Sequence, residues 1–212
     1  MSFQFTRPDT FPPVVKNLVI INALIFVAQL VLDDQYQITQ LFALYPVDSP
    51  EFRPYQIATH MFTHSPQLLF HILFNMLTLW MFGRILENYW GGKRFLLFYI
   101  LCGVGASVLH LLILSYEFVP MASDLMQLSQ MSVSGSSDFN QAVLAYSKAH
   151  NIQLTRILSE NNVSLATPGI RTEIMELLTN NYNKTLNTAT LGASGAVFGI
   201  IMAFVYLFPN TY

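Results

Sequence analysis

Four long stretches of mostly apolar residues punctuate the chain, at about residues 14–32, 68–86, 95–116 and 191–208. A helix needs about 20 apolar residues to cross the hydrocarbon core of a bilayer, so the pattern predicts four transmembrane helices, the fourth near the short limit. No small-residue cleavage site follows the first stretch, and we therefore interpret it as a retained helix rather than a signal peptide.

The composition agrees with a membrane protein. Of 212 residues, 53% are hydrophobic and only 10% are charged, whereas soluble domains carry about a quarter charged residues. The formal net charge is −2 and there is no basic stripe, which argues against nucleic acid as a partner. Cys102 is the one cysteine, so there is neither a disulfide framework nor a cysteine metal site.

Lysine and arginine predict the orientation. Arg7 and Lys16 precede or begin the first stretch, and Arg84, Lys93 and Arg94 cluster between the second and third. Short loops rich in these residues stay in the cytoplasm. We expect an integral, multi-pass protein of a bacterial plasma (inner) membrane with a cytoplasmic N-terminus.

The chain is predicted to have three parts. Residues 1–117 hold an N-terminal tail and the first three transmembrane helices, residues 118–190 form an extracytoplasmic insertion, and residues 191–212 hold the fourth helix. The overall class is an all-α membrane protein with a polytopic helix bundle.

The insertion has helical character of its own. Residues 132–138 are predicted to form a loop, and residues 138–160 can contain helix. Pro168 suits a first helical turn, and an amphipathic stripe follows it at Ile170, Ile174, Leu177 and Leu178. A gate or partner-binding unit is one interpretation, and an ordinary solvated loop with weak helices is the other.

The fourth stretch opens with Gly192-Ala193-Ser194-Gly195. A serine hydroxyl is a nucleophile only when a base activates it. Small neighbours leave amide N–H groups free at a helix start, where they and the helix dipole can stabilise an oxyanion. The alternative is packing, because Gly195 and Gly199 form a G-x-x-x-G pair.

The second stretch carries His71 and Asn75 inside an otherwise apolar helix. A spacing of four places both on one helix face. Polar groups at such depth are costly and mark function, and both side chains can donate to an oxyanion. An interhelical contact that only holds the bundle together is the alternative.

Three histidines, His60, His64 and His71, lie close together in the sequence. A metal site is conceivable, but the H-E-x-x-H motif is absent and structural hydrogen bonding is favoured. His110 is expected to make a structural contact, and His150 to be solvated within the insertion.

Together these features resemble the rhomboid family of intramembrane serine proteases. The resemblance rests on four segments: residues 55–64, similar to the family's first loop; His71 to Asn75, matching H-x-x-x-N; residues 82–87 with Gly91, Arg94 and Phe95, matching the end of the second helix and its turn; and residues 192–195, matching the nucleophile motif.

The resemblance implies a role for each matched position. Ser194 is the nucleophile, supported by Gly192, Ala193 and Gly195 in its motif. The Ser194 backbone N–H and the side chains of His71 and Asn75 form the oxyanion hole. His64 is a structural histidine, and Glu87 belongs to a polar network. The implied substrates are transmembrane segments within the lipid bilayer, and no metal or cofactor is required.

The sequence departs from the family in its first loop, where Tyr55-Gln56 stands in place of the usual Trp-Arg pair, and in its histidines. The family's general base is a histidine on its sixth helix, whereas every histidine here precedes Ser194. We therefore expect the remaining two helices and the base beyond Tyr212. The alternative is a four-helix, catalytically inactive relative that binds transmembrane clients. The sequence leaves the oligomeric state open.

Overall fold

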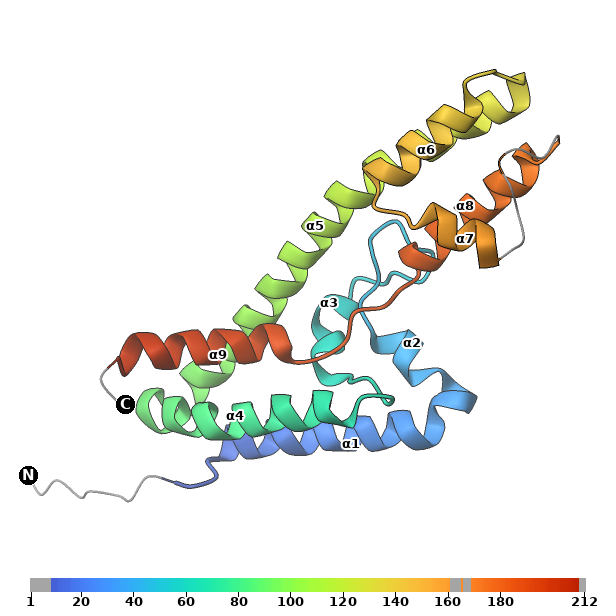
Figure 1. Ribbon diagram of the computed structural model, residues 1–212. Coiled ribbons are helices and arrows are strands. Elements are labelled where there is room, and N and C mark those ends of the chain that lie inside the picture. The colour runs from blue at the N-terminus through green and yellow to red at the C-terminus, as the bar shows by residue number, and fades with distance from the viewer. Residues whose placement is uncertain (1–8, 161–164, 166–168, 210–212) are drawn as a thin grey trace, which may run out of the picture. The chain divides into compact units, whose positions relative to one another are not determined.

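A computed structural model describes residues 9–160, 165 and 169–209; the side chains of Thr155 and Ile157 are also outside the description. All regular elements of this part are helical, as predicted, apart from one isolated bridge (Figure 1). The elements are α1 (Pro13–Tyr36), α2 (Ile38–Phe42), α3 (Gln56–Thr59), a 3-10 turn (His60–Phe62), α4 (Leu69–Trp90), α5 (Gly92–Ser134), α6 (Phe139–Ala149), α7 (Leu154–Glu160), α8 (Arg171–Leu186) and α9 (Ser194–Leu207).

Three of the described helices, α1, α4 and α5, are long and apolar enough to cross a membrane, and α9 is a shorter apolar helix. They coincide with the four predicted stretches. The helix of the third stretch does not end at residue 116, however, but continues to Ser134. The loop predicted over residues 132–138 begins only there, with Gly135 at a φ of +72°.

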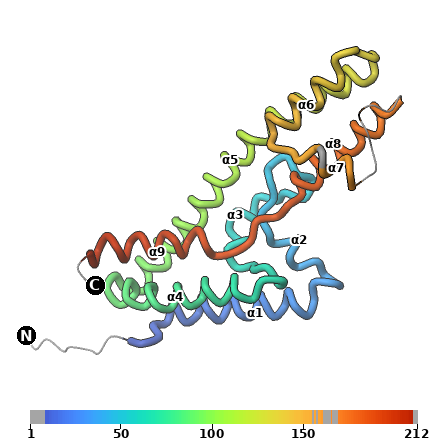
Figure 2. The backbone as a smooth tube through the Cα atoms, in the orientation of Figure 1, coloured from blue at the N-terminus to red at the C-terminus, as the bar shows by residue number. Residues whose placement is uncertain are grey.

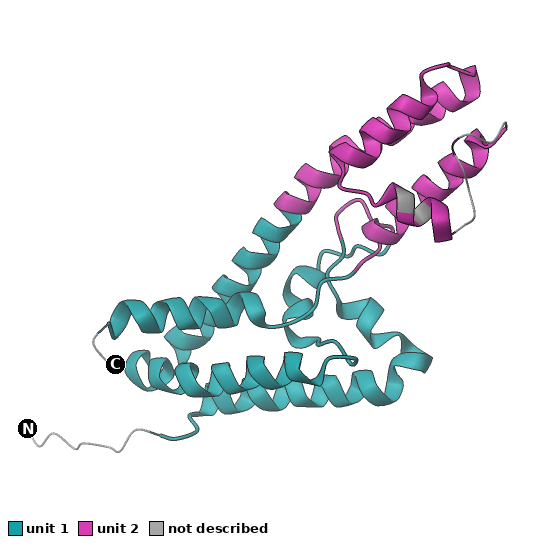
Figure 3. Ribbon diagram, in the orientation of Figure 1, with its two compact units in different colours: residues 1–45, 51–111, 189–212 teal, residues 46–50, 112–188 magenta. Residues whose placement is uncertain are grey.

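The chain divides into two compact units, which Figure 3 colours separately. Unit 1 comprises residues 1–45, 51–111 and 189–212, and unit 2 comprises residues 46–50 and 112–188. Each unit has its own buried apolar cluster.

Unit 2 explains why α5 continues past residue 116. Four of its later residues, Phe118, Met121, Leu125 and Leu128, are buried among side chains of α6 and α8. This packing extends the helix even though Pro120 lacks one backbone donor. The predicted stripe on α8 is confirmed: Ile174 and Leu178 are fully buried, and Ile170 and Leu177 pack against the same cluster. Pro168 lies outside the described residues.

Unit 1 is built around α4, which contacts both α1 and α9 (Figure 2). In this unit Gly195 and Gly199 also have the helix-packing role that their G-x-x-x-G spacing predicts. A Cβ atom added to Gly195 would lie 2.5 Å from Ala106 Cβ, and one added to Gly199 would lie 2.5 Å from Cys102 Sγ. Only glycine allows α9 to lie this close to α5.

Glu87 joins the C-terminal turn of α4 to the start of α1. Helix α1 has no side-chain cap of its own, and its first N–H groups have no partner within the helix. The buried Glu87 carboxylate accepts hydrogen bonds from two of these groups, the backbone N–H of Val14 at 2.9 Å and that of Val15 at 2.7 Å. The predicted polar network is thus a helix cap supplied by another helix.

A second polar clamp holds the loop before α4. Gln29 of α1 is buried; its Oε1 accepts the His64 backbone N–H at 3.0 Å, and its Nε2 donates to the His64 carbonyl at 3.0 Å. Both ring nitrogens of the fully buried His64 lack a hydrogen-bond partner among the described residues. Burial, with a smaller contribution from neighbouring His71, therefore lowers the pKa of His64 from its ordinary 6.5 to about 4.

We predict that Glu87→Gln lowers the free energy of unfolding of the detergent-solubilised protein by about 1–3 kcal/mol. A glutamine amide offers one oxygen, and its NH₂ group faces one of the two α1 donors. Chemical denaturation followed by circular dichroism measures the change. The matched control is Glu173→Gln at an exposed position of α8, and equal effects of the two substitutions would contradict the cap.

The buried imidazole predicts a pH-dependent stability. Because the folded pKa of His64 is below its unfolded value, the stabilisation is complete above pH 6.5 and is lost as the pH falls toward about 4. We expect His64→Gln to remove on the order of 2 kcal/mol of the stability change between about pH 7.5 and about pH 5. Denaturation series at both pH values measure it, and an unchanged pH slope in the variant would show that His64 does not titrate as described.

Candidate active site

A cavity of about 520 Å³ in unit 1 brings the predicted site residues together. Ser194 of α9 and both His71 and Asn75 of α4 line it, although more than a hundred residues separate the serine from the other two. The remaining lining is Leu68, Phe70, Phe74, Thr78, Val197, Phe198 and Ile201. A nucleophile candidate and two donor candidates thus share one largely apolar chamber.

Ser194 is the first residue of α9, after Ala193 as the N-cap residue, and no side chain caps this helix. The N–H groups of a first helical turn have no carbonyl partner within the helix and carry the positive end of its dipole. The Ser194 hydroxyl makes no hydrogen bond within the part of the chain described, and the residue is half-buried. Its hydroxyl and the helix start are therefore available to a ligand.

Gly192 allows His71 to lie against the turn that precedes the serine. Its φ of +111° falls in the region that favours glycine. A Cβ atom at residue 192 would lie 2.6 Å from His71 Nε2. The backbone N–H of Gly192 donates to the His60 carbonyl at 3.0 Å. A side chain at residue 192 would displace the imidazole, so this glycine determines where His71 lies relative to α9.

Thr190 anchors the same turn, a role that no sequence motif predicted. Its backbone pairs with Leu44 in an antiparallel bridge, with N···O distances of 2.8 and 3.0 Å. Its hydroxyl lies 2.7 Å from His110 Nε2 of α5. His110 therefore makes the structural contact expected of it, here to the segment that positions the serine.

Asn75 is buried, and its Nδ2 donates to the His71 carbonyl one turn earlier at 2.8 Å. An amide NH₂ group has two N–H bonds, so a second donor remains. The His64 ring lies beside the His71 ring, with centroids 5.2 Å apart and planes at 61°. The buried His64 ring thus packs against the His71 ring and restricts its position.

The other two histidines are engaged elsewhere. His60 lies with Nδ1 3.0 Å from the Gln56 carbonyl and Nε2 3.3 Å from Ser107 Oγ, and burial lowers its pKa. In unit 2, His150 Nε2 lies 2.8 Å from Asp124, so it is not simply solvated as predicted. Among the described residues, no group of three or more His, Cys, Asp and Glu is placed to hold a metal ion.

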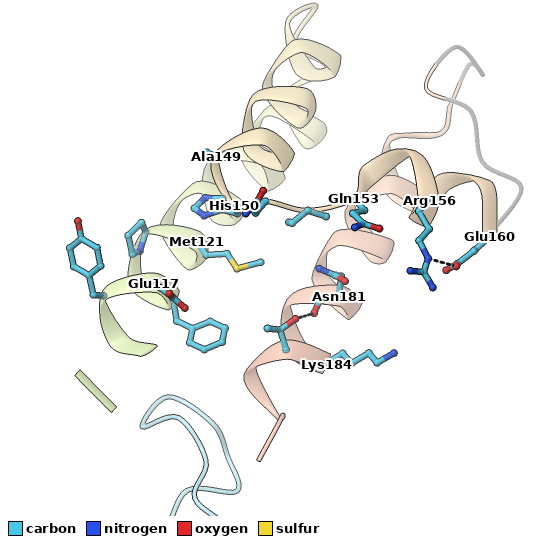
Figure 4. A pocket seen from close by; sticks show the side chains of 15 residues that line it. Glu117, Met121, Ala149, His150, Gln153, Arg156, Glu160, Asn181 and Lys184 are labelled. Atoms are coloured by element: carbon cyan, nitrogen blue, oxygen red, sulfur yellow. Dashed lines mark hydrogen bonds and ion pairs between the residues drawn. The ribbon is translucent and has the colours of Figure 1, made fainter. Parts of the chain in front are cut away.

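Unit 2 contains a larger cavity, of about 960 Å³, shown in Figure 4. Residues of α5, α6, α7 and α8 line it, and within it Arg156 Nε donates to Glu160 at 2.7 Å. Its lining includes none of the predicted catalytic residues. Size therefore does not identify the candidate active site; the convergence of chemically suitable groups does.

Comparison with known proteins gives the family. A model of the rhomboid domain matches residues 51–167, more than half of the 212-residue chain. The match contains His71, Asn75 and Glu87, extends into the insertion that the motifs left outside the resemblance, and ends before Ser194. No curated protein and no solved structure matches the chain. The chain belongs to the rhomboid family, and its apolar helices make it an integral membrane protein.

Proposed function

We propose that the protein is an intramembrane serine endopeptidase that cleaves transmembrane segments of other membrane proteins. One observation carries the proposal: Ser194, His71 and Asn75 line a single cavity between α4 and α9. Rhomboid proteins are typically proteases of this class, so the family and the geometry favour the same chemistry.

In the proposed reaction, Ser194 Oγ attacks the scissile carbonyl carbon, and negative charge develops on the carbonyl oxygen. The Ser194 N–H at the helix start, the His71 imidazole and the second N–H of Asn75 supply donors to that oxygen. The serine proton moves to a base and then to the leaving amine. By the family resemblance that base is a histidine on a later helix than the one that carries the serine.

The chamber suits an unwound transmembrane segment. Leu68, Phe70, Phe74 and Phe198 present apolar surface, while the free N–H groups at the start of α9 can donate to a carbonyl oxygen released from helical hydrogen bonding. We place the protein in a bacterial plasma membrane with its N-terminus in the cytoplasm and Ser194 near the outer surface.

We predict that Ser194→Ala in the full-length protein abolishes cleavage of a model transmembrane substrate and abolishes labelling by a fluorophosphonate probe. The substitution removes the oxygen that both reactions require. Gel assays after reconstitution measure both. The control, Ser159→Ala, alters an exposed serine of α7 whose hydroxyl donates to the Arg156 carbonyl of the same helix, and it should retain full activity.

Cleavage that persists in Ser194→Ala would refute the assignment. Wild-type protein that binds a transmembrane client without cutting it or reacting with the probe would instead support the inactive, client-binding alternative.

For the oxyanion donor, we predict that Asn75→Ala lowers kcat by roughly 10²-fold with a modest change in KM. The matched control is Thr78→Val, which changes a polar side chain in the lining of the same cavity and should leave kcat nearly unchanged. A loss of folded protein at unchanged kcat would support a packing role for Asn75.

A further inference from the structure

An apolar stripe runs along the part of α5 that belongs to unit 2. Leu112, Val119, Met126 and Val133 follow one another at intervals of seven residues and are 63%, 60%, 67% and 88% exposed. We call these four residues the heptad stripe. Seven-residue spacing keeps side chains on one side of a helix over several turns.

The rest of unit 2 fixes the direction of the heptad stripe. Phe118, Met121, Leu125 and Leu128 occupy a different side of α5 and are buried in the core of unit 2. This anchored face cannot turn outward without opening that core. The heptad stripe therefore remains uncovered by the unit that carries it.

Lipid does not explain the exposed stripe. About 20 residues span the hydrocarbon core, and α5 has 43. From Glu117 onward its sequence mixes polar with apolar residues, the polar ones including Glu117, Ser123, Asp124, Gln127 and Gln130. Val119, Met126 and Val133 lie beyond the length that hydrocarbon covers if the apolar first half of α5 spans the membrane, and exposed apolar side chains there are candidates for contact with a protein partner.

We infer that the heptad stripe is a dimerisation seam on which α5 of a second copy of this chain packs in parallel. Helix α5 runs without interruption from its apolar first half into unit 2. Both copies share one orientation in a membrane, so their α5 helices leave it in the same direction and at the same residue. Under a two-fold axis, Met126 then faces Met126 and Val133 faces Val133, the arrangement of a parallel coiled coil.

The charge pattern favours a second copy. Tyr116, Ser123 and Gln130 lie between the heptad positions on the same side, four residues after each of the first three, and none of them is charged. Identical helices therefore meet without like-charge repulsion along the seam. Uncharged polar residues in such a seam favour one register over its neighbours.

The seam continues toward the membrane. The same seven-residue register reaches Gly105, where an added Cβ atom would meet nothing within 4 Å. A small residue at this position lets two helices approach in the bilayer. Confinement to one membrane also raises the effective concentration of copies for one another.

Cysteine cross-linking tests the seam independently of protease activity. In a Cys102→Ala background, Val119→Cys and Met126→Cys are placed singly in the full-length protein, reconstituted in phosphatidylcholine vesicles at a low protein-to-lipid ratio. We expect oxidation to give several-fold more covalent dimer than with Glu117→Cys, an exposed position on another side of α5. Met126→Glu should lower the cross-linking of Val119→Cys by a similar factor, because charges then face each other across the seam.

Equal cross-linking at residues 117 and 126 would indicate random collision and overturn the proposal. The absence of covalent dimer at every position would also overturn the proposal. A photoreactive group at residue 126 that labels only an added transmembrane client helix, and no second copy, would overturn it in the same way. Circular dichroism of each variant checks that the protein remains folded: residues 117, 119 and 126 are exposed, whereas Cys102 is half-buried against α9 and its alanine variant serves as the common reference. Failure of the seam would leave the proposed protease reaction untouched, and an inactive Ser194→Ala protein should still cross-link.

Discussion

The close approach of α9 to its neighbours is the constraint on which the candidate site depends. Gly195 and Gly199 let α9 lie against Ala106 and Cys102 of α5, and Gly192 leaves room for the His71 ring. Each contact is too short for a side chain at the glycine. The same residues that pack the helix therefore set the depth of Ser194 and the place of its neighbours, so packing and catalysis are not competing explanations of this motif.

Polar groups in unit 1 fall into two classes that differ in whether they have partners. Glu87 and Gln29 are buried with their hydrogen bonds made, and each joins α1 to a part of the chain far away in sequence. In an apolar environment such bonds hold the helices in one arrangement, because breaking them leaves unsatisfied groups. The Ser194 hydroxyl, in contrast, has no partner among the described residues and opens onto a cavity. The ring nitrogens of His64 also lack partners but are fully buried, so it is the opening onto a cavity that distinguishes Ser194 as the candidate for chemistry.

The insertion is a folded helical unit rather than a solvated linker. Its buried cluster draws on α5, α6 and α8, and it encloses a cavity of about 960 Å³. Helix α5 contributes residues to both units, with the division at Leu112. A dimer formed through the heptad stripe would use the length of α5 that this unit stabilises.

The sequence by itself determined the helical class, the four apolar stretches and the residue types of the site, because hydropathy and four-residue spacing act locally along a helix. His71 and Asn75 could be placed on one face from their numbers alone. The sequence could not show that Ser194 shares their cavity, that Thr190 pairs with Leu44, or that Glu87 caps α1. These contacts join residues distant in the chain, and only the packing of the helices brings them together. The end of the third helix was misplaced for the same reason, since the core that carries α5 to Ser134 exists only once α6 and α8 pack against it.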